Sequence, residues 1–489
     1  MRLGNASTPP NILIILTDQQ RQFRHWPKGW AEQHLPSFSR LAANGLTFER
    51  AFTNTCMCSP SRATLWTSLF PAQTGVASTG GQGLGPDFTT LAQVMTDAGY
   101  QVGYRGKWHL GDTGEYTPEA HGFGPWDPPD AGTTLSPGPT QGAGAYNNDT
   151  RYLGTVTGSG EKPSGTGPSM IDFLKSVTPG TPFCLVASFV NPHDVFVAPF
   201  QYEAAGYDPS TWQDFPIQPP GSWNEDLSTK PSVQSWFQGS ATRWNVPSWS
   251  DANRTSYARF YAYLQALVDQ DIQTLLDTLD HCGFTQNTVI FRLADHGEMA
   301  MSHGLVEKTF NAYDETLNVP LIISNSQLFP TPVVTKELVG HIDLLPTLAS
   351  VAGVLDTYEG KFKGKDMSPL FTAPDTPLQK SVHFTFDDTA LAGGLPASTP
   401  DHIRALRTKD WLYAAYFTET GSAFEYELYD LVNDRDQLTN LASPKYITPD
   451  GQKQLVEMNH ELIRRMKHYG TTPSGFTWPA KPDISITDK

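Results

Sequence analysis

A cysteine stands directly before a segment that is predicted to be helical. The run from Cys58 to Arg62 reads Cys-Ser-Pro-Ser-Arg, and the residues from Ser59 to Leu69 have the pattern of a short helix. The first turn of a helix presents free N–H groups and the positive end of the dipole, so an anion beside Cys58 would be stabilised. Two simpler interpretations are a buried structural cysteine and half of a metal site shared with Cys56, although no second cysteine pair or nearby histidine completes such a site.

Acidic groups follow two apolar segments that lie far apart in the sequence. Residues 11–18 form an apolar run that ends in Asp18, and the apolar run 288–293 is soon followed by Asp295 and His296. Strands buried on both faces have this composition, and ligand sites in α/β folds lie at the carboxyl ends of such strands. The pattern predicts a metal site made by two strand ends, although Asp18 could instead only cap the next element.

Several lysine and histidine side chains could serve a reaction on an anion. Lys107 and His109 follow one predicted strand, His193 follows another, and Lys308 comes later in the chain. Histidine titrates near neutral pH and therefore suits proton transfer. Each of these residues alone is more often an ordinary surface or core side chain, and it is their combination that indicates catalysis.

The elements that must position these residues alternate between strand and helix. Besides residues 11–18, strands are predicted at 99–106, 183–190, 288–293 and 319–324. Helices are predicted at 36–44, 59–69, 89–98, 254–282 and 343–353. This alternation predicts an α/β fold with a mostly parallel central sheet flanked by helices.

The pattern changes near Pro374. Short strands are predicted at 382–386, 403–408, 411–417 and 425–431, and a helix at 451–468. Closely spaced short strands favour an antiparallel sheet. We therefore expect a catalytic α/β domain over residues 1–375 and a smaller C-terminal α+β subdomain, an antiparallel sheet plus a helix, over residues 376–489.

A tryptophan-rich segment of irregular pattern covers residues 195–253. Its tryptophans stand among Pro, Ser and Gly residues, and the segment is too apolar for a disordered linker. It could line an apolar pocket, or it could pack as a large insertion.

Composition and charge exclude several classes of partner. The 489 residues carry 34 Lys and Arg against 50 Asp and Glu, a formal net charge of −16. Nucleic acids are bound through clustered Lys and Arg, so we expect no nucleic acid partner. No stretch approaches the ~20 apolar residues of a membrane span, and the first apolar run, Ile12 to Leu16, is too short for the core of a signal peptide.

Taken in chain order, these motifs resemble those of the type I sulfatases, the formylglycine-dependent family of the alkaline phosphatase superfamily. The resemblance begins at residues 12–19 and includes Cys-x-Pro-x-Arg at Cys58. It continues with Gly-Lys-Trp-His at 106–109, Pro-His at 192–193, Asp-His-Gly-Glu at 295–298 and Glu-Leu-Tyr-Asp at 427–430. It implies a sulfatase that hydrolyses small sulfate monoesters, such as aryl or alkyl sulfates. It also implies that a formylglycine-generating enzyme oxidises Cys58 to formylglycine, whose hydrate is the nucleophile.

The resemblance assigns a role to each candidate residue. The implied metal ligands are Asp18, Gln19, Asp295 and His296. Arg62 would brace the metal-bound diol, while Lys107 and Lys308 would contact the sulfate oxygens. His109 would remove the proton whose loss restores the aldehyde, and His193, with Lys308, would protonate the leaving alcohol.

Some positions depart from the usual family pattern. Ser68 stands where the longer signature usually has glycine, although the Cys-x-Pro-x-Arg core is intact. Gln19 and His296 stand where many relatives have Asp and Asn, so only two carboxylates would face the ion. Calcium prefers oxygen ligands and is the family's usual ion, whereas imidazole suits manganese, which is the alternative. Glu298 and His303, close to the second strand end, are expected to be supporting or structural residues.

Cysteine usage bears on the compartment. Modification of Cys58 would leave three cysteines, an odd number that does not make a disulfide framework and fits a reducing compartment. We therefore expect a cytoplasmic protein with no membrane partner, which could be an oligomer.

Two alternative functions stay open at this point. One is a phosphonate monoester or phosphodiester hydrolase of the same superfamily, whose members share the formylglycine and the Asp-Gln start. Those relatives tend to lack the pair formed here by Lys107 and His109, so the sequence favours a sulfate ester. The other is a catalytically silent binding protein on this scaffold.

Overall fold

A seven-stranded sheet forms the centre of the computed structural model, which describes residues 9–23, 26–111, 113–126, 130, 149–155, 169–239, 245–390 and 392–484. The strands in spatial order are β4 (Gln101–Gly106), β5 (Phe183–Pro192), β1 (Asn11–Asp18), β6 (Thr288–Ala294), β7 (Leu321–Ser324), β2 (Gly45–Phe48) and β8 (Val333–Thr335). Neighbouring strands run parallel, except that β7 is antiparallel to both β6 and β2. The predicted mostly parallel sheet is thus confirmed.

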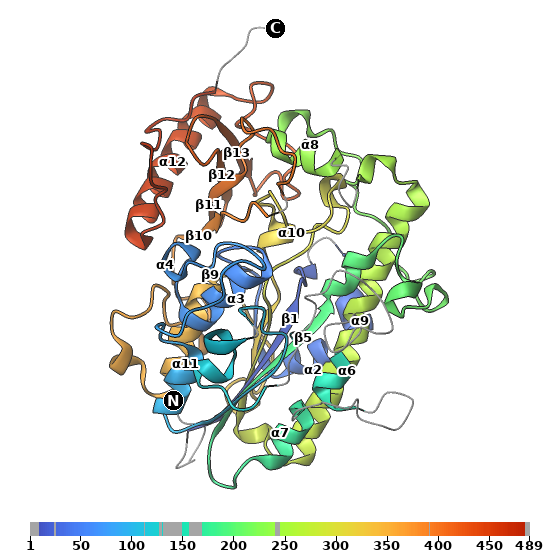
Figure 1. Ribbon diagram of the computed structural model, residues 1–489, viewed down its shortest axis with the longest axis vertical. Coiled ribbons are helices and arrows are strands. Elements are labelled where there is room, and N and C mark those ends of the chain that lie inside the picture. The colour runs from blue at the N-terminus through green and yellow to red at the C-terminus, as the bar shows by residue number, and fades with distance from the viewer. Residues whose placement is uncertain are drawn as a thin grey trace.

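Both faces of this sheet are covered by helices, as Figure 1 shows. Alternate residues of β1 belong to two separate apolar clusters: Ile12 and Ile14 lie in one, and Leu13 and Ile15 in the other. The first cluster includes residues of α3 (Cys58–Thr67), α5 (Leu91–Asp97) and α11 (Leu344–Ala352). The second includes residues of α2 (Pro36–Ala43), α6 (Asp149–Leu153), α7 (Met170–Ser176) and α9 (Asp251–His281). A strand buried on both faces needs an unbroken apolar sequence, which is what residues 12–16 provide.

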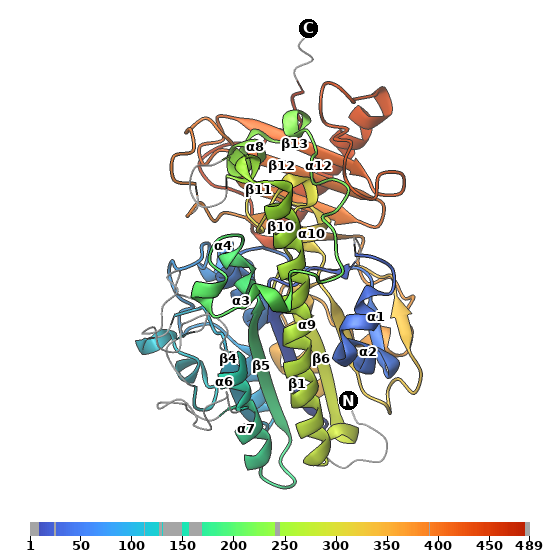
Figure 2. The ribbon, with the colours of Figure 1, turned by 90° about the vertical axis from the view of Figure 1, so that its right-hand side faces the viewer.

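The long helix α9 runs along β5, β1 and β6 (Figure 2). It begins at a sequence signal, because the Ser250 side chain accepts a hydrogen bond from the backbone N–H of Asn253. Its apolar stripe supplies Leu264 and Tyr261 to one cluster and Ile272 and Leu276 to another. The helix therefore links the central sheet to the tryptophan-rich segment 195–253.

A second sheet of four antiparallel strands follows in the order β10 (Ser381–Phe386), β11 (His402–Thr408), β12 (Trp411–Phe417) and β13 (Phe424–Asp430). The helix α12 (Pro449–Tyr469) packs on one face through Leu455 and Leu462, beside Tyr413. Side chains of the opposite face, including Phe384 and Phe386, belong to the same apolar cluster as the upper part of α9. The second sheet thus packs against the N-terminal part of α9, whose C-terminal part packs on the central sheet in a separate cluster.

The predicted helices and strands that border the site are present, with ends shifted by a few residues. The strands β2 and β8 were not predicted, because they are short and only extend the sheet beyond β7. Among the described residues, no helix combines the length and apolarity that crossing a membrane requires.

The tryptophan-rich segment packs as an insertion. Trp212 and Trp249 are buried in the core cluster around α9, and Trp223 and Trp236 pack against that cluster. Trp244 lies outside the described residues. The described tryptophans are absent from the lining of the large cleft above Cys58, to which the segment contributes Phe196.

Candidate active site

Two neighbouring parallel strands bring the acidic residues together. Thr17 of β1 is the register partner of Ala294 of β6, so Asp18 and Asp295 leave the sheet side by side. The backbone N–H of Asp295 donates to the carbonyl of Thr17 at 3.1 Å. Both carboxylates are fully buried. The predicted meeting of two strand ends is therefore present.

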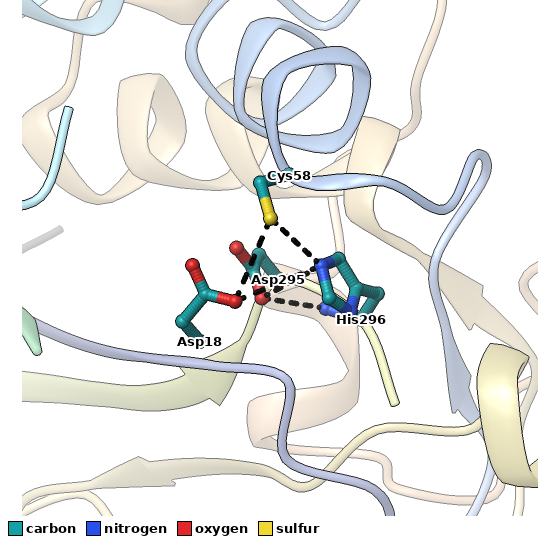
Figure 3. Close-up of side chains that lie close together, drawn as sticks. All are labelled: Asp18, Cys58, Asp295 and His296. Atoms are coloured by element: carbon teal, nitrogen blue, oxygen red, sulfur yellow. Dashed lines mark hydrogen bonds and ion pairs between the residues drawn. The ribbon is translucent and has the colours of Figure 1, made fainter. Parts of the chain in front are cut away.

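Cys58 is the first residue of α3, and its side chain points at this acidic pair (Figure 3). Its Sγ lies 3.3 Å from Nε2 of His296 and 3.7 Å from Oδ1 of Asp18. One ligand atom from each of Asp18, Cys58, Asp295 and His296 lies within 4.8 Å of the others. Two carboxylates and an imidazole around one point fit a divalent cation.

The neighbouring cysteine has a different environment. The thiol of Cys56 donates to the carbonyl of Lys308 at 3.2 Å and does not belong to the group around Asp18. The interpretation of Cys56 and Cys58 as two ligands of one metal site is therefore not supported.

Arg62 and Lys107 balance the two carboxylates. Nε of Arg62 donates to Asp295 at 3.0 Å, and its Nη2 donates to Asp18 at 3.1 Å. Nζ of Lys107 lies 2.5 Å from Asp18 and 3.8 Å from Sγ of Cys58. Lys107 follows Gly106, where a side chain would place its Cβ 1.8 Å from the carbonyl oxygen of Ser188. The glycine thus lets β4 approach β5 closely at the site.

Gln19 belongs to a second buried network. Its amide nitrogen donates to Glu298 at 2.5 Å and to Glu307 at 3.2 Å, while its Oε1 accepts a hydrogen bond from Lys308 at 2.6 Å. Lys308 also pairs with Glu307 at 3.1 Å. Tyr257 donates to Glu298 at 2.8 Å. Glu298 therefore orients the Gln19 side chain by a hydrogen bond and does not itself belong to the metal-ligand group.

The predicted histidines border a cleft of about 520 Å³ above Cys58. His109 and His193 both line it, and both interact with the Cys58 side chain. The backbone N–H groups of Trp108 and His109 donate to the Asp130 carboxylate, which holds this turn in place. Within the described part of the chain, Nδ1 of each of the two histidines has no hydrogen-bond partner and is available to other groups.

The site's charges shift several pKa values. Burial raises the pKa of the Cys58 thiol, but Lys107, Lys308 and His296 outweigh it and hold that pKa well below its ordinary value. Burial, together with the positive charge of Lys107, lowers the pKa of His193 to about 4. Against the effect of burial, Asp295 raises the pKa of His296 to about 9. The position of Cys58 is thus strongly electropositive.

Several residues of the site were missed by the sequence analysis. Asp130 and Glu307 line the cleft, and Ser188 accepts a hydrogen bond from Arg62 at 2.9 Å. The turn 79–83, rich in glycine, forms another wall of the cleft. Ser188 lies inside a strand pattern, and the others lie in loops where no spacing rule applies. His303, by contrast, pairs with Glu225 and stacks on Tyr313, a structural environment.

Comparison with known proteins gives consistent matches. The family model described as Sulfatase matches residues 10–354, and the model described as N-sulphoglucosamine sulphohydrolase, C-terminal, matches residues 301–468. An ulvan-active sulfatase of Formosa agariphila is 28% identical over 477 residues, covering 94% of this chain and 83% of that protein.

Solved structures share the fold at low sequence identity. A 2-O GAG sulfatase has a TM-score of 0.73 and 24% identity, over 97% of this chain and 95% of that one. A phosphonate monoester hydrolase of Agrobacterium radiobacter has a TM-score of 0.69 and 20% identity, over 94% and 96%.

Proposed function

Because the chain belongs to the sulfatase family and is therefore a hydrolase of sulfate esters, we propose that it cleaves small aryl or alkyl sulfates by means of formylglycine made from Cys58 and a bound divalent metal ion. One observation carries this proposal. The Cys58 side chain lies at the floor of the cleft, at 3.3 Å from His296 and 3.7 Å from Asp18. A buried structural cysteine would not need two lysines, two histidines and a carboxylate around it.

Asp18, Asp295 and His296 would hold the metal ion. The resemblance implies the Gln19 amide oxygen as the fourth ligand, and this oxygen would then exchange its hydrogen bond from Lys308 for the ion. The ion would act as a Lewis acid toward the sulfuryl group and would orient the nucleophile. Calcium is the family's usual ion, and the imidazole of His296 makes manganese the alternative.

The aldehyde at residue 58 would supply, as its hydrate, an oxygen nucleophile for sulfur and a second hydroxyl through which sulfate can depart. Lys107 and Lys308 would neutralise the sulfuryl oxygens, and Arg62 would keep the carboxylates of Asp18 and Asp295 in place. His193 would donate a proton to the ester oxygen as the S–O bond breaks. His109 would then take the proton from the second hydroxyl, so that sulfate leaves and the aldehyde is restored.

The pKa of His193 bears on its role as the acid. Burial keeps it near 4, so His193 is neutral in the free protein at pH 7. A sulfate ester bound beside it would bring a negative charge that raises this pKa. Lys308, whose pKa is raised by Glu307 against the effect of burial, would remain charged throughout.

The chain would need a formylglycine-generating enzyme as a partner. In the folded chain Cys58 is only 1% exposed, so this enzyme would have to act before folding is complete. All four cysteines are free thiols, which supports our expectation of a reducing, cytoplasmic compartment.

Hydrolysis of matched esters tests the proposed function. Fully modified protein would be assayed with nitrophenyl sulfate, nitrophenyl phenylphosphonate and nitrophenyl phosphate, with Cys58→Ala as the inactive control. We expect the sulfate to give the highest kcat/KM. Preferential hydrolysis of the phosphonate would favour the alternative enzyme, and no hydrolysis of any ester would favour a silent binding protein.

A further inference from the structure

The walls of the cleft above Cys58 differ from its floor in charge. Two cationic side chains, Lys107 and Lys308, lie around Cys58 at the base of the cleft, and of these Lys308 lines it. Among the described residues that line the cleft, Lys308 is the only lysine or arginine, and it is paired with Glu307 at 3.1 Å. The remaining charged lining is acidic or imidazole.

The segments that form the walls of the cleft also lack lysine and arginine in their sequence. The walls come from the turn at 79–83, from residues 109–111 with 130, from residues around 193–196, and from residue 390. No lysine or arginine occurs in residues 63–104, 109–150, 176–229 or 381–403. A basic side chain that could reach the part of a substrate beyond its sulfate group is therefore lacking in the segments that form these walls.

The same walls offer apolar surface. Met57, Leu110, Phe196 and Ala390 line the cleft. The ring of Phe196 is stacked on His193, with centroids 5.8 Å apart and an interplanar angle of 17°. An apolar group next to the proposed proton donor lies where the leaving alcohol must be.

The wall segments are also fastened to one another. Oδ2 of Asp388 accepts a hydrogen bond from the backbone N–H of Thr79 at 2.7 Å, and its Oδ1 accepts one from Ala390 at 3.0 Å. The backbone N–H of Leu84 donates to the carbonyl of Leu110 at 3.0 Å. The cleft is thus largely preformed, with a volume in the ~300–1,000 Å³ range of small-molecule sites.

From these observations we propose that the substrate is a monosulfate ester whose leaving group is uncharged and apolar, an aryl or alkyl alcohol, and not a saccharide bearing further sulfates or carboxylates. This inference rests on the proposed function. Carboxylate and sulfate groups are recognised by Arg and Lys, and an anion moved into a cleft without such partners loses hydration without compensation. An apolar alcohol gains from burial against Phe196 and Leu110.

Three aryl sulfates with matched phenols test this inference. The three compounds are 4-butylphenyl, 4-(2-carboxyethyl)phenyl and 4-(2-trimethylammonioethyl)phenyl sulfate. In each, two methylene groups separate the ring from the terminal group, so the pKa of the leaving phenol stays nearly constant while the charge of the terminal group changes. We expect kcat/KM for the butyl compound to exceed that for the carboxylate by about ten-fold or more. Equal or faster turnover of the carboxylate or of the ammonium compound would overturn the inference and leave the sulfatase function intact. No turnover of any of the three would instead overturn the proposed function.

Two variants of residues in the cleft walls test whether these walls determine the selectivity for the leaving group. Gln82 is exposed and lines the cleft, so Gln82→Arg should raise relative turnover of the carboxylate by about five-fold. Gln452→Arg, at an exposed position of α12 outside the cleft lining, should not. Phe196→Ala should lower turnover of the butyl compound. Phe200→Ala is the matched control, because Phe200 is 67% exposed and outside the cleft lining. Unchanged selectivity in both Gln82→Arg and Phe196→Ala would contradict the inference.

Discussion

At the scale of single residues, the site is a set of buried charges that neutralise one another. Arg62 and Lys107 both contact Asp18, and Arg62 also contacts Asp295. Removing one partner of such a pair leaves an uncompensated buried charge, which commonly costs about 3–5 kcal/mol. These four charged residues therefore contribute to folding as well as to the proposed chemistry.

The first prediction concerns the metal ion. Asp295→Asn removes one of the two negative charges of the proposed ligand set, so we expect it to lower metal content and kcat more than Gln19→Ala does. Metal content would be measured by elemental analysis after dialysis. Asp277→Asn, at a surface position where the side chain is 52% exposed, is the matched control. Full activity of metal-free wild-type protein would contradict the metal assignment.

The second prediction separates the two histidines of the cleft. An acid is needed most when the leaving group is poor, so His193→Ala should reduce turnover of alkyl sulfates by about 10²–10⁴-fold and that of nitrophenyl sulfate much less. His109→Ala should instead release one equivalent of alcohol in a burst and then stall. Rapid-quench kinetics on both substrates distinguishes the roles. Equal losses on both substrates for His193→Ala, or steady turnover without a burst for His109→Ala, would contradict them.

The sequence predicted the residues of this site better than it predicted their surroundings. Asp18 and Asp295 were found because each follows an apolar strand, and carboxyl ends of parallel strands meet. Asp130 and Asp388 could not be found, because each acts from a loop by binding backbone N–H groups that are distant in the chain. Nothing in the local pattern distinguishes such an aspartate from a solvated one.

At the scale of elements, α3 explains the unusual Ser68. The helix ends at Thr67, and Ser68 adopts a left-handed backbone with φ of 57°, a conformation that favours glycine. Here the Ser68 hydroxyl donates to the carbonyl of Ile342 at 2.6 Å and accepts from the N–H of Gly364 at 3.0 Å. These two bonds tie the end of α3 to a distant segment and offset the strain.

The third prediction follows from this cap. Ser68→Ala loses both hydrogen bonds and keeps the left-handed strain, so it should lower stability by about 2 kcal/mol. Ser68→Gly loses the same bonds but relieves about 1 kcal/mol of strain, so it should cost less. Thermal unfolding measures both, with exposed Ser176→Ala as the control. A larger loss for the glycine variant would show that the backbone strain is not significant.

Element prediction from sequence worked where the pattern was long. The strands β1, β5 and β6 and the helix α9 have continuous apolar runs or stripes that few other structures satisfy. The strand β8 has three residues and is partly exposed, so its pairing depends on its neighbours in the sheet and not on its own composition. The proposed division at residues 375 and 376 stays a prediction.

At the scale of the whole molecule, His383 of β10 lies where the second sheet meets the segment that follows α3. Its Nδ1 lies 3.1 Å from the carbonyl of Ala405, and its Nε2 lies 2.8 Å from the hydroxyl of Thr471. Its ring is stacked on Tyr469 and close to Phe70, a residue that follows α3. Burial, with the charge of Arg404, lowers the pKa of His383 to about 3.

The fourth prediction is an acid-induced loss of stability through His383. A histidine whose pKa is lower in the folded chain than in the unfolded chain stabilises the fold fully above pH ~6.5 and progressively less as the pH falls toward 3. Its contribution should fall by about 3 kcal/mol between pH 7 and pH 4.5. Denaturant unfolding of His383→Gln should show a correspondingly smaller pH dependence, whereas exposed His460→Gln should behave as wild type. An unchanged dependence in His383→Gln would contradict this account.

The most direct test of the central claim is the mass of the peptide that contains residue 58, measured together with activity across preparations with different degrees of modification. We predict that residue 58 is found as an aldehyde, which is lighter than cysteine, and that kcat rises in proportion to the modified fraction. Cys58→Ala should be inactive but as stable as the unmodified protein, because the side chain lies in a polar site and not in an apolar core. Full sulfatase activity in a preparation whose residue 58 is entirely a free thiol would contradict the account.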